Sequence, residues 1–328
     1  MALDLHFSPD GHQLAVVLES IVTGENLKQW TRIYGVPDGK VLLEIANGNR
    51  RCAWSQNGSM LAVLHGIGVD FDLWDTRTWT RKQRVHLTVL DDMIRFGTIR
   101  PDDPNMLWVK RLCFDQHANL YVVQNSVAGE LELPPHLVRP HAWWNEAGHL
   151  VEGESIGTVP ATPTQYDISA ASVGRETRLA IAYCSGPPRS CRTEILRVHM
   201  DAGGKRTVGR EYQLPEGGTV CLTPDGQYLA MLNRSFCLFR LYDSHADLVY
   251  SRAVQPAMHT GSEIDVSLDG RLAAYASRGQ VDVVRIPDCR CMLVVRQSAH
   301  AIALSPDGRL LAVADPDRES IRCYRIPQ

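Results

Sequence analysis

The chain has 328 residues, of which 44% are hydrophobic and 22% charged, a composition that supports a buried core and excludes a disordered chain. Lys and Arg number 34 against 37 Asp and Glu, so the formal charge of −3 provides no basic field for nucleic-acid binding. No segment resembles a transmembrane helix, and residues 1–11 lack the basic and apolar regions of a signal peptide.

The nine cysteines are scattered, and no two of them form a Cys-x-x-Cys pair. Several lie in expected strands, where a free thiol packs as a small apolar side chain. Cys184 and Cys191 flank a Pro-Pro loop and could pair if oxidised, but free thiols are expected. Cys289 and Cys291 are too close along the chain for an unstrained disulfide. We therefore predict a reducing, cytoplasmic location, with neither a cofactor nor a metal.

A Ser-Pro-Asp-Gly turn recurs along the chain. It occurs at residues 8–11 and 305–308, with variants at 55–58, 223–226 and 267–270 and a degenerate copy at 115–118. Proline presets φ, aspartate accepts hydrogen bonds from nearby amides, and glycine takes positive φ, so each copy favours a tight turn. Apolar segments flank the turns, which predicts a β-hairpin at each copy.

A Leu-Ala pair marks the second strand of most hairpins. The pairs lie at 14/15, 61/62, 179/180, 229/230, 272/273 and 311/312, and Leu120-Tyr121 takes the remaining place. Successive leucines are 39 to 59 residues apart, a spacing typical of propeller blades. The alanine indicates a crowded strand on which neighbouring sheets pack. Seven copies predict seven blades.

Third and fourth strands follow each hairpin in the pattern. Residues 69–75, 237–243 and 281–286 alternate as half-buried third strands do, and polar turns then lead to segments such as 41–46. We therefore predict an all-β, seven-bladed β-propeller of four-stranded antiparallel blades, forming one domain over residues 1–328. The expected blades are about residues 3–47, 50–87, 111–157, 166–214, 218–255, 262–297 and 300–328, with an inter-blade insertion at 88–110.

On these marks the chain resembles WD-repeat (WD40-like) β-propellers of the divergent bacterial type. Leu73-Trp74-Asp75 matches the Trp-Asp ending of a third strand, and Tyr242-Asp243 is a near variant. The Gly-His dipeptide of that family is missing, so its His-Asp network between strands is not expected. The resemblance covers essentially the whole chain. It implies a non-catalytic scaffold or sensor that binds a partner protein or another domain of its own chain.

The last expected blade lacks its outermost strand. The chain begins on a first strand at residues 3–7 and ends on a third strand at 321–326. An open edge of this kind is a template for strand addition. Three alternatives remain: a missing N-terminal part of a longer protein could supply the strand, the edge could stay three-stranded, or a partner's strand could fill it.

Long loops on one face are the expected binding surface. The insertion at about residues 87–110 combines charges with Phe and Trp, a composition typical of protein-binding loops. Loops at 19–28 and 185–192 are expected on the same face. The alternative is a long connection that packs on its own scaffold. The candidate partner-binding residues are Asp91, Asp92, Arg95, Phe96, Arg100, Trp108 and Arg189.

No catalytic constellation is convincing. Residues 153–157 match Gly-x-Ser-x-Gly, but they end a fourth strand and precede prolines, whereas the nucleophile elbow needs a strand-to-helix turn. His136, His141 and His149 have spacings that fit no compact metal motif. We therefore predict no catalytic and no metal-binding residues.

The alternative function is a small-ligand propeller, similar to lactone hydrolases, with a site in the central channel. Such an enzyme needs several polar residues at equivalent mouths of the first strands. Asp265, Asp167 and His6 are the candidates, and they are too few and unmatched. A binding role is the better supported expectation.

Overall fold

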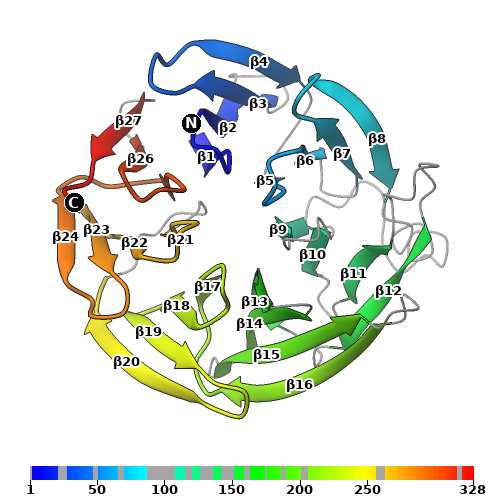
Figure 1. The fold of residues 1–328 in the computed structure, drawn as a ribbon, viewed down its shortest axis with the longest axis vertical. Helices are drawn as coiled ribbons and strands as arrows, with labels where there is room; N and C mark the ends of the chain where they lie inside the picture. The colour runs from blue at the N-terminus through cyan, green and yellow to red at the C-terminus, as the bar shows by residue number, and fades with distance from the viewer. Residues whose placement is uncertain are drawn as a thin grey trace.

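The structure is a computed structural model that describes residues 2–20, 28–46, 51–65, 70–86, 108–114, 120–125, 136–141, 151–158, 163–173, 176–185, 190–200, 206–255, 263–315 and 320–328. All regular elements in these residues are β-strands, and their sheets form a ring around a central axis (Figure 1). Within the described ranges, no helix is long and apolar enough to cross a membrane.

Six sheets in the described chain have four antiparallel strands, ordered from an inner first strand to an outer fourth strand. The first three are β1 (Ala2–Phe7), β2 (Gln13–Ser20), β3 (Lys28–Gly35) and β4 (Val41–Ala46); β5 (Cys52–Trp54), β6 (Met60–His65), β7 (Asp70–Asp75) and β8 (Thr80–His86); and β9 (Trp108–Phe114), β10 (Leu120–Asn125), β11 (His136–His141) and β12 (Val151–Thr158). The next three are β13 (Pro163–Val173), β14 (Glu176–Ser185), β15 (Ser190–Met200) and β16 (Arg206–Leu214); β17 (Thr219–Leu222), β18 (Tyr228–Leu232), β19 (Ser235–Leu241) and β20 (Ala246–Ala253); and β21 (Ile264–Val266), β22 (Leu272–Ser277), β23 (Gln280–Arg285) and β24 (Cys291–Val295).

The remaining sheet has three strands: β25 (Ala301–Leu304), β26 (Leu310–Asp315) and β27 (Ser320–Arg325). The expectation of a seven-bladed propeller of four-stranded blades is therefore wrong, because only six blades in the described chain are four-stranded, while the last sheet has three strands in the described residues, as was expected for it. That expectation came from counting Leu-Ala pairs, which mark second strands. A complete blade also needs an outermost strand, whose presence the pair does not report.

Turn chemistry explains the inner hairpins. The hydroxyl of Ser8 donates to Asp10 at 2.6 Å and accepts from the amide of Gln13 at 2.9 Å, while Gly11 has a φ of 74°. The same bonds recur in other copies, and the glycine of the 305–308 turn has a φ of 64°. A β-carbon is strained at such φ values, which explains the glycine. The five predicted turns in the described chain are confirmed, and the degenerate copy at 115–118 lies outside the described residues.

The core is divided among the contacts between neighbouring sheets. An alanine stands seven residues after the first residue of five turns, and its exposed fraction is 0% in every one: Ala15, Ala62, Ala230, Ala274 and Ala312. Adjacent sheets pack directly on these positions, as the sequence predicted. One apolar cluster contains Leu5 and Val16 of the first sheet and Ala314 of the last. The ring is thus closed by side-chain packing between β1–β2 and β25–β26.

Candidate functional site

The predicted partner-binding residues lie outside the described part of the chain. Six of them are in segments that the structure does not describe: Asp91, Asp92, Arg95, Phe96, Arg100 and Arg189. Trp108 begins β9, but its side chain is also outside the described atoms. That binding surface stays a prediction. The described residues offer two other features, the edge of β27 and a polar cluster on β1 and β5.

The outer edge of β27 is uncovered in the described chain. The strand pairs with β26 along its length, and the amide of Ile326 donates to the carbonyl of Arg309 at 2.8 Å. Because antiparallel residues alternate in direction, Ile321, Cys323 and Arg325 turn their backbone N–H and C=O groups away from β26. No described strand pairs with that side, and β27 is the outermost strand of its sheet in Figure 1. In the described chain, β27 is therefore an edge strand.

The exposure of equivalent third-strand side chains also distinguishes the last sheet from complete sheets. The third-strand residue that pairs with the buried alanine has an exposed fraction of 0% or 1% in four complete blades: Ile33, Leu73, Leu238 and Val283. The residue paired with Ala312 is Cys323, which is exposed. A fourth strand places side chains beside the third strand on both faces of a sheet. Cys323 is exposed at a position that is buried where a fourth strand is present.

In the first sheet, Tyr34 lies at the position where the third strands of two other sheets contact the fourth strand of the preceding sheet. Trp74 shares a cluster with Leu43 of the preceding fourth strand, and Tyr324 shares one with Leu293 of β24. Tyr34 has the same position in its own third strand, because all three pair with the leucine before the buried alanine. The cluster that Tyr34 joins contains no fourth-strand residue among the described side chains. Tyr34 therefore lies where an added outer strand would pack.

Two acidic residues of the inner strands hold neighbouring sheets together. Asp167 accepts a hydrogen bond at Oδ2 from the amide of Val220 at 2.8 Å, and Asp265 accepts one from the amide of Leu304 at 2.7 Å. The donors belong to the first strand of the next sheet in each pair. These contacts give both carboxylates a structural role. They do not support the channel enzyme for which the two residues were candidates.

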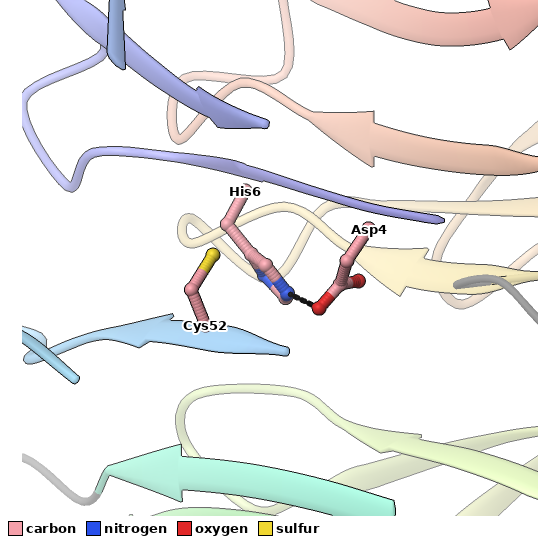
Figure 2. A group of neighbouring side chains, drawn as sticks. All are labelled: Asp4, His6 and Cys52. Carbon is pink, nitrogen blue, oxygen red and sulfur yellow. Dashed lines mark ion pairs between the residues drawn. The ribbon is translucent and has the colours of Figure 1, made fainter. Parts of the chain in front are cut away.

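A second polar group joins the first two blades (Figure 2). Asp4 and His6 lie on β1 and Cys52 begins β5, and one possible ligand atom of each of the three lies within 4.8 Å of the other two. Nε2 of His6 is 3.0 Å from Oδ2 of Asp4, whose side chain is 1% exposed against 31% for His6. Arg51 approaches the other carboxylate oxygen, with Nη1 3.9 Å from Oδ1. The cluster therefore combines three kinds of metal-binding side chain.

Burial determines the protonation of the Cys52 thiol. Desolvation, reinforced by the charge of Asp4, raises its pKa well above the usual range, and Arg51 opposes this shift. The thiol is thus protonated at neutral pH. The sequence pattern indicated His6 but not its neighbours, because they come together only where the first strands of two consecutive blades, β1 and β5, lie side by side.

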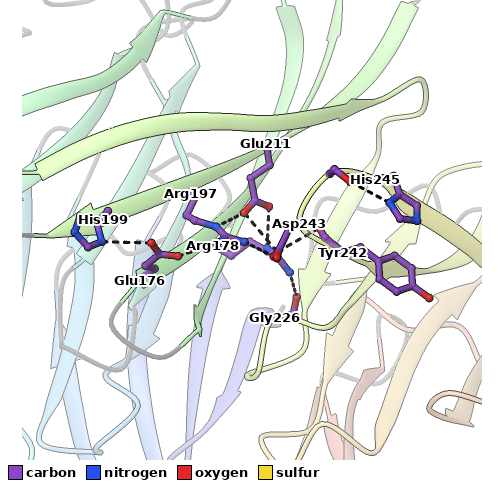
Figure 3. Close-up of polar contacts among 10 residues, drawn as sticks. Glu176, Arg178, Arg197, His199, Glu211, Gly226, Tyr242, Asp243 and His245 are labelled. Carbon is purple, nitrogen blue, oxygen red and sulfur yellow. Dashed lines mark hydrogen bonds and ion pairs between the residues drawn. The ribbon is translucent and has the colours of Figure 1, made fainter.

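A network of ion pairs also crosses between two blades (Figure 3). Nε of Arg178 lies 3.0 Å from Oε2 of Glu211, and the two side chains are only 5% and 6% exposed. Nη1 of Arg178 donates to the carbonyl of Gly226 at 2.7 Å, in the turn of the next sheet. Arg197 pairs with Glu211 and reaches Asp243 at 2.7 Å. The network fastens β13–β16 to the following sheet, and its charges are already matched within the fold.

The Gly-x-Ser-x-Gly segment is part of a strand. Residues 153–157 lie in β12, and Ser155 is paired with Val138 of β11. The strand-to-helix turn of a nucleophile elbow is therefore not formed, which confirms that expectation. His136 and His141 bound β11, but their side chains and the whole of His149 are outside the described atoms. The expectation for these histidines stays untested.

One cysteine expectation is wrong. Cys191 is disulfide-bonded, whereas a free thiol was expected. The hairpin of β14 and β15 sets Cys184 directly opposite Cys191 in the strand register. Paired positions in antiparallel strands are close enough for a disulfide, and this pairing follows from the strand alignment rather than from sequence spacing. Cys289 and Cys291 are free, as expected.

No protein-family model and no curated protein sequence matches this chain. Solved structures do. The β-propeller domain of Cps50 (Swd1) from Myceliophteria thermophila has a TM-score of 0.66 at 15% identity, covering 99% of this chain and 96% of that one. A chain of hydrazine synthase from Kuenenia stuttgartiensis has a TM-score of 0.63 at 12% identity, with coverages of 99% and 95%. A chain of the mitotic checkpoint complex has a TM-score of 0.61 at 16% identity, with coverages of 99% and 90%.

These similarities concern the fold. At such identities, one fold carries many unrelated functions. The similar structures include a propeller domain, a chain of an assembly named as a complex, and a chain of a synthase. The fold therefore does not decide between binding and catalysis. The chain is an all-β protein with a β-propeller fold.

Proposed function

We propose that this chain is a non-catalytic scaffold or sensor propeller of the WD-repeat kind, which binds a partner protein by accepting one of its extended segments beside β27. The observation that carries the proposal is the exposure of Cys323, at a position buried in the four complete blades compared above. Strand addition to an open edge is a recurring mode of peptide recognition. It would restore at this sheet the environment that the other third strands already have.

The lengths and inward side chains of the existing fourth strands indicate what kind of partner segment would fit beside β27. They include β24, with five residues, and β20, with eight. Their inward side chains, such as Leu293 and Tyr250, join the clusters between blades. The partner segment should thus supply an apolar residue every second position, one of which packs against Tyr34. Its alternate residues would face solvent and be polar.

Backbone pairing alone would not give tight binding. Three residues of β27 present one N–H and one C=O each, and the resulting bonds would contribute roughly 0.5–1.5 kcal/mol apiece. Ordering each residue of a free segment costs roughly 1–2 kcal/mol, which cancels most of that gain. The surplus must come from apolar contacts with Tyr34 and Ile321. Selectivity should therefore depend on the side chains of the segment.

Peptide selection tests the edge. Random peptides displayed on phage are selected on the wild-type chain, and enriched sequences are synthesised and titrated. Cys323→Pro removes an outward N–H without removing a bond to β26, so it should weaken binding by about tenfold or more. Cys323→Ala keeps that N–H and should bind as the wild type does.

Arg325→Pro provides a second variant, because its N–H also points outward and its loss should weaken the same peptides. Melting curves of all variants establish that they are folded. If no peptide is enriched, or if the enriched peptides bind both proline variants as well as the wild type, strand addition at β27 is wrong.

The insertion at residues 88–110 is proposed as a further contact, on its composition alone. Once a partner is known, its recovery by the wild type is compared with recovery by a chain lacking residues 90–106. Reduced recovery would support the loop. Unchanged recovery would remove the loop from the interface and leave the edge proposal intact.

A further inference from the structure

We propose that Asp4, His6 and Cys52 form a Zn²⁺ site with three protein ligands, which links the first strands of two neighbouring blades. The three side chains converge from β1 and β5, and each offers one ligand atom within 4.8 Å of the other two. Among the described residues, no other group of three His, Cys, Asp or Glu side chains has this geometry. A carboxylate, an imidazole and a thiolate are the three side-chain ligand types that zinc takes in proteins.

The distances fit zinc after a small adjustment. Bond lengths of roughly 2.0–2.3 Å in a tetrahedral arrangement place ligand atoms about 3.3–3.8 Å apart. Nε2 of His6 and Oδ2 of Asp4 are 3.0 Å apart, and the widest separation in the cluster is at most 4.8 Å. Shifts of about 1 Å or less, within the reach of side-chain rotation, would bring the atoms into range.

The charges around the cluster also allow a cation. Arg51 lies near Oδ1 of Asp4, whereas His6 lies near Oδ2, so the guanidinium and the metal would use different oxygens. Cys52 would lose its thiol proton to solvent as the S–Zn bond forms. The two anionic ligands and Arg51 then surround Zn²⁺ with a small net charge. A fourth position would remain for water on the side where His6 is partly exposed.

The same residues have another explanation without metal. Asp4 and Asp167 occupy equivalent positions in the first strands of their sheets. Asp4 lies three residues before Phe7 and Asp167 three residues before Ala170, and Phe7 and Ala170 each pair with the leucine of the Leu-Ala mark in the second strand. Asp167 bonds to the backbone of the next sheet. A structural carboxylate at that position does not require His6 or a thiol beside it. The convergence of all three ligand types is what points to a metal.

Zinc titration of the full chain tests the site. Chelator-treated protein is titrated with ZnCl₂ by calorimetry, and with CoCl₂ as a spectroscopic probe. We expect one Zn²⁺ per chain and a near-ultraviolet sulfur-to-cobalt absorption band. His6→Gln, which alters a partly exposed side chain, and Cys52→Ala should each weaken Zn²⁺ binding by about tenfold or more. Cys52→Ala should also abolish the band.

Two matched variants control for nonspecific effects. His199→Gln alters another histidine that lies near a carboxylate, 3.3 Å from Glu176, and Cys237→Ala removes another buried free thiol. Both should leave Zn²⁺ affinity unchanged. If the wild type binds no Zn²⁺, or if His6→Gln binds it as tightly as the wild type does, the proposal is overturned. The second outcome remains decisive even if Cys52→Ala fails to fold.

Discussion

The sheets β21–β24 and β25–β27 are neighbours and begin alike, yet their third strands have different environments. Each sheet has the same turn, with Ser267 or Ser305 donating to an aspartate, and each places a fully buried alanine in the second strand. The difference appears one strand further out. Val283 is fully buried beside β24, whereas Cys323 is exposed at the uncovered edge of β27.

This comparison shows what the fourth strand contributes. Both third strands pair with their second strands, so hydrogen bonding on that side does not distinguish them. The burial of a third strand depends on a neighbour that follows it in a complete blade. In the last sheet the described chain does not provide that neighbour. The free edge is therefore where the last sheet differs from the four complete sheets whose equivalent third-strand residue is described as buried.

The largest expected effect comes from truncating equivalent third-strand residues. Leu238→Ala should lower the free energy of unfolding by about 2–5 kcal/mol, because Leu238 is fully buried and its loss leaves a cavity. Cys323→Ala should change it by no more than about 0.5 kcal/mol, because the side chain is exposed. Urea unfolding of the two variants measures the difference. Similar losses would contradict the claim that the positions differ in burial.

Replacing an arginine should also lower the free energy of unfolding more in a complete blade than in the last sheet, but the difference should be smaller. Arg178→Met should cost about 3 kcal/mol, because it removes the buried partner of Glu211 between two complete blades. Arg197 still pairs with Glu211 and limits the loss. Arg322→Met, which removes only a 3.5 Å contact with Gln297, should cost about 1 kcal/mol or less. Thermal and urea unfolding of both variants provide the measurement, and equal losses would break the comparison.

Replacing the turn aspartate should have the smallest effect on stability, and this effect should be the same in a four-stranded sheet and in the three-stranded sheet. Burial is the largest single influence and opposes ionisation of Asp10 and Asp307, but the hydrogen bonds from Ser8 and Ser305, those from nearby backbone amides and the neighbouring positive charges together outweigh it and lower both pKa values. A lowered folded pKa stabilises the protein above the unfolded value near 3.8, and this contribution is lost as the pH falls through the folded pKa.

Asp10→Asn and Asp307→Asn should therefore each lower the melting temperature by about 2 °C or less at neutral pH, an estimate reduced for solvent screening. The deficit should shrink as the pH falls below the unfolded value near 3.8 and disappear once the pH is below the lowered folded pKa, where the wild-type carboxylates are protonated. Melting curves from pH 2 to 7 test this. A deficit in only one variant would show that the inner hairpins differ after all.

Much of the fold could be predicted because its signals are local. Four contiguous residues specify each tight turn, as the hydrogen bonds that Asp10 accepts from the Ser8 hydroxyl and the His12 amide illustrate. Alternation of apolar residues marks the strands on either side of the turn. The small alanine of the second strand predicted close packing of sheets, which Ala15 and Ala312 confirm. These features depend on a residue and its near neighbours in sequence. They are sufficient to identify a propeller.

Other features depend on how strands align and on which strands of neighbouring sheets lie side by side. The number of complete blades cannot be obtained from second-strand markers, because such a marker carries no information on whether an outer strand is present. The pairing of Cys184 with Cys191 in register follows from how two strands align. The cluster of Asp4, His6 and Cys52 needs β1 beside β5.

Sequence by itself thus determined the repeating hairpins and the propeller fold. Tertiary structure decided which third-strand side chains are buried and which polar residues meet between blades. The physical reason is the range of the interactions involved. A turn forms from bonds among adjacent residues, whereas burial and side-chain clusters depend on neighbours supplied by distant parts of the chain.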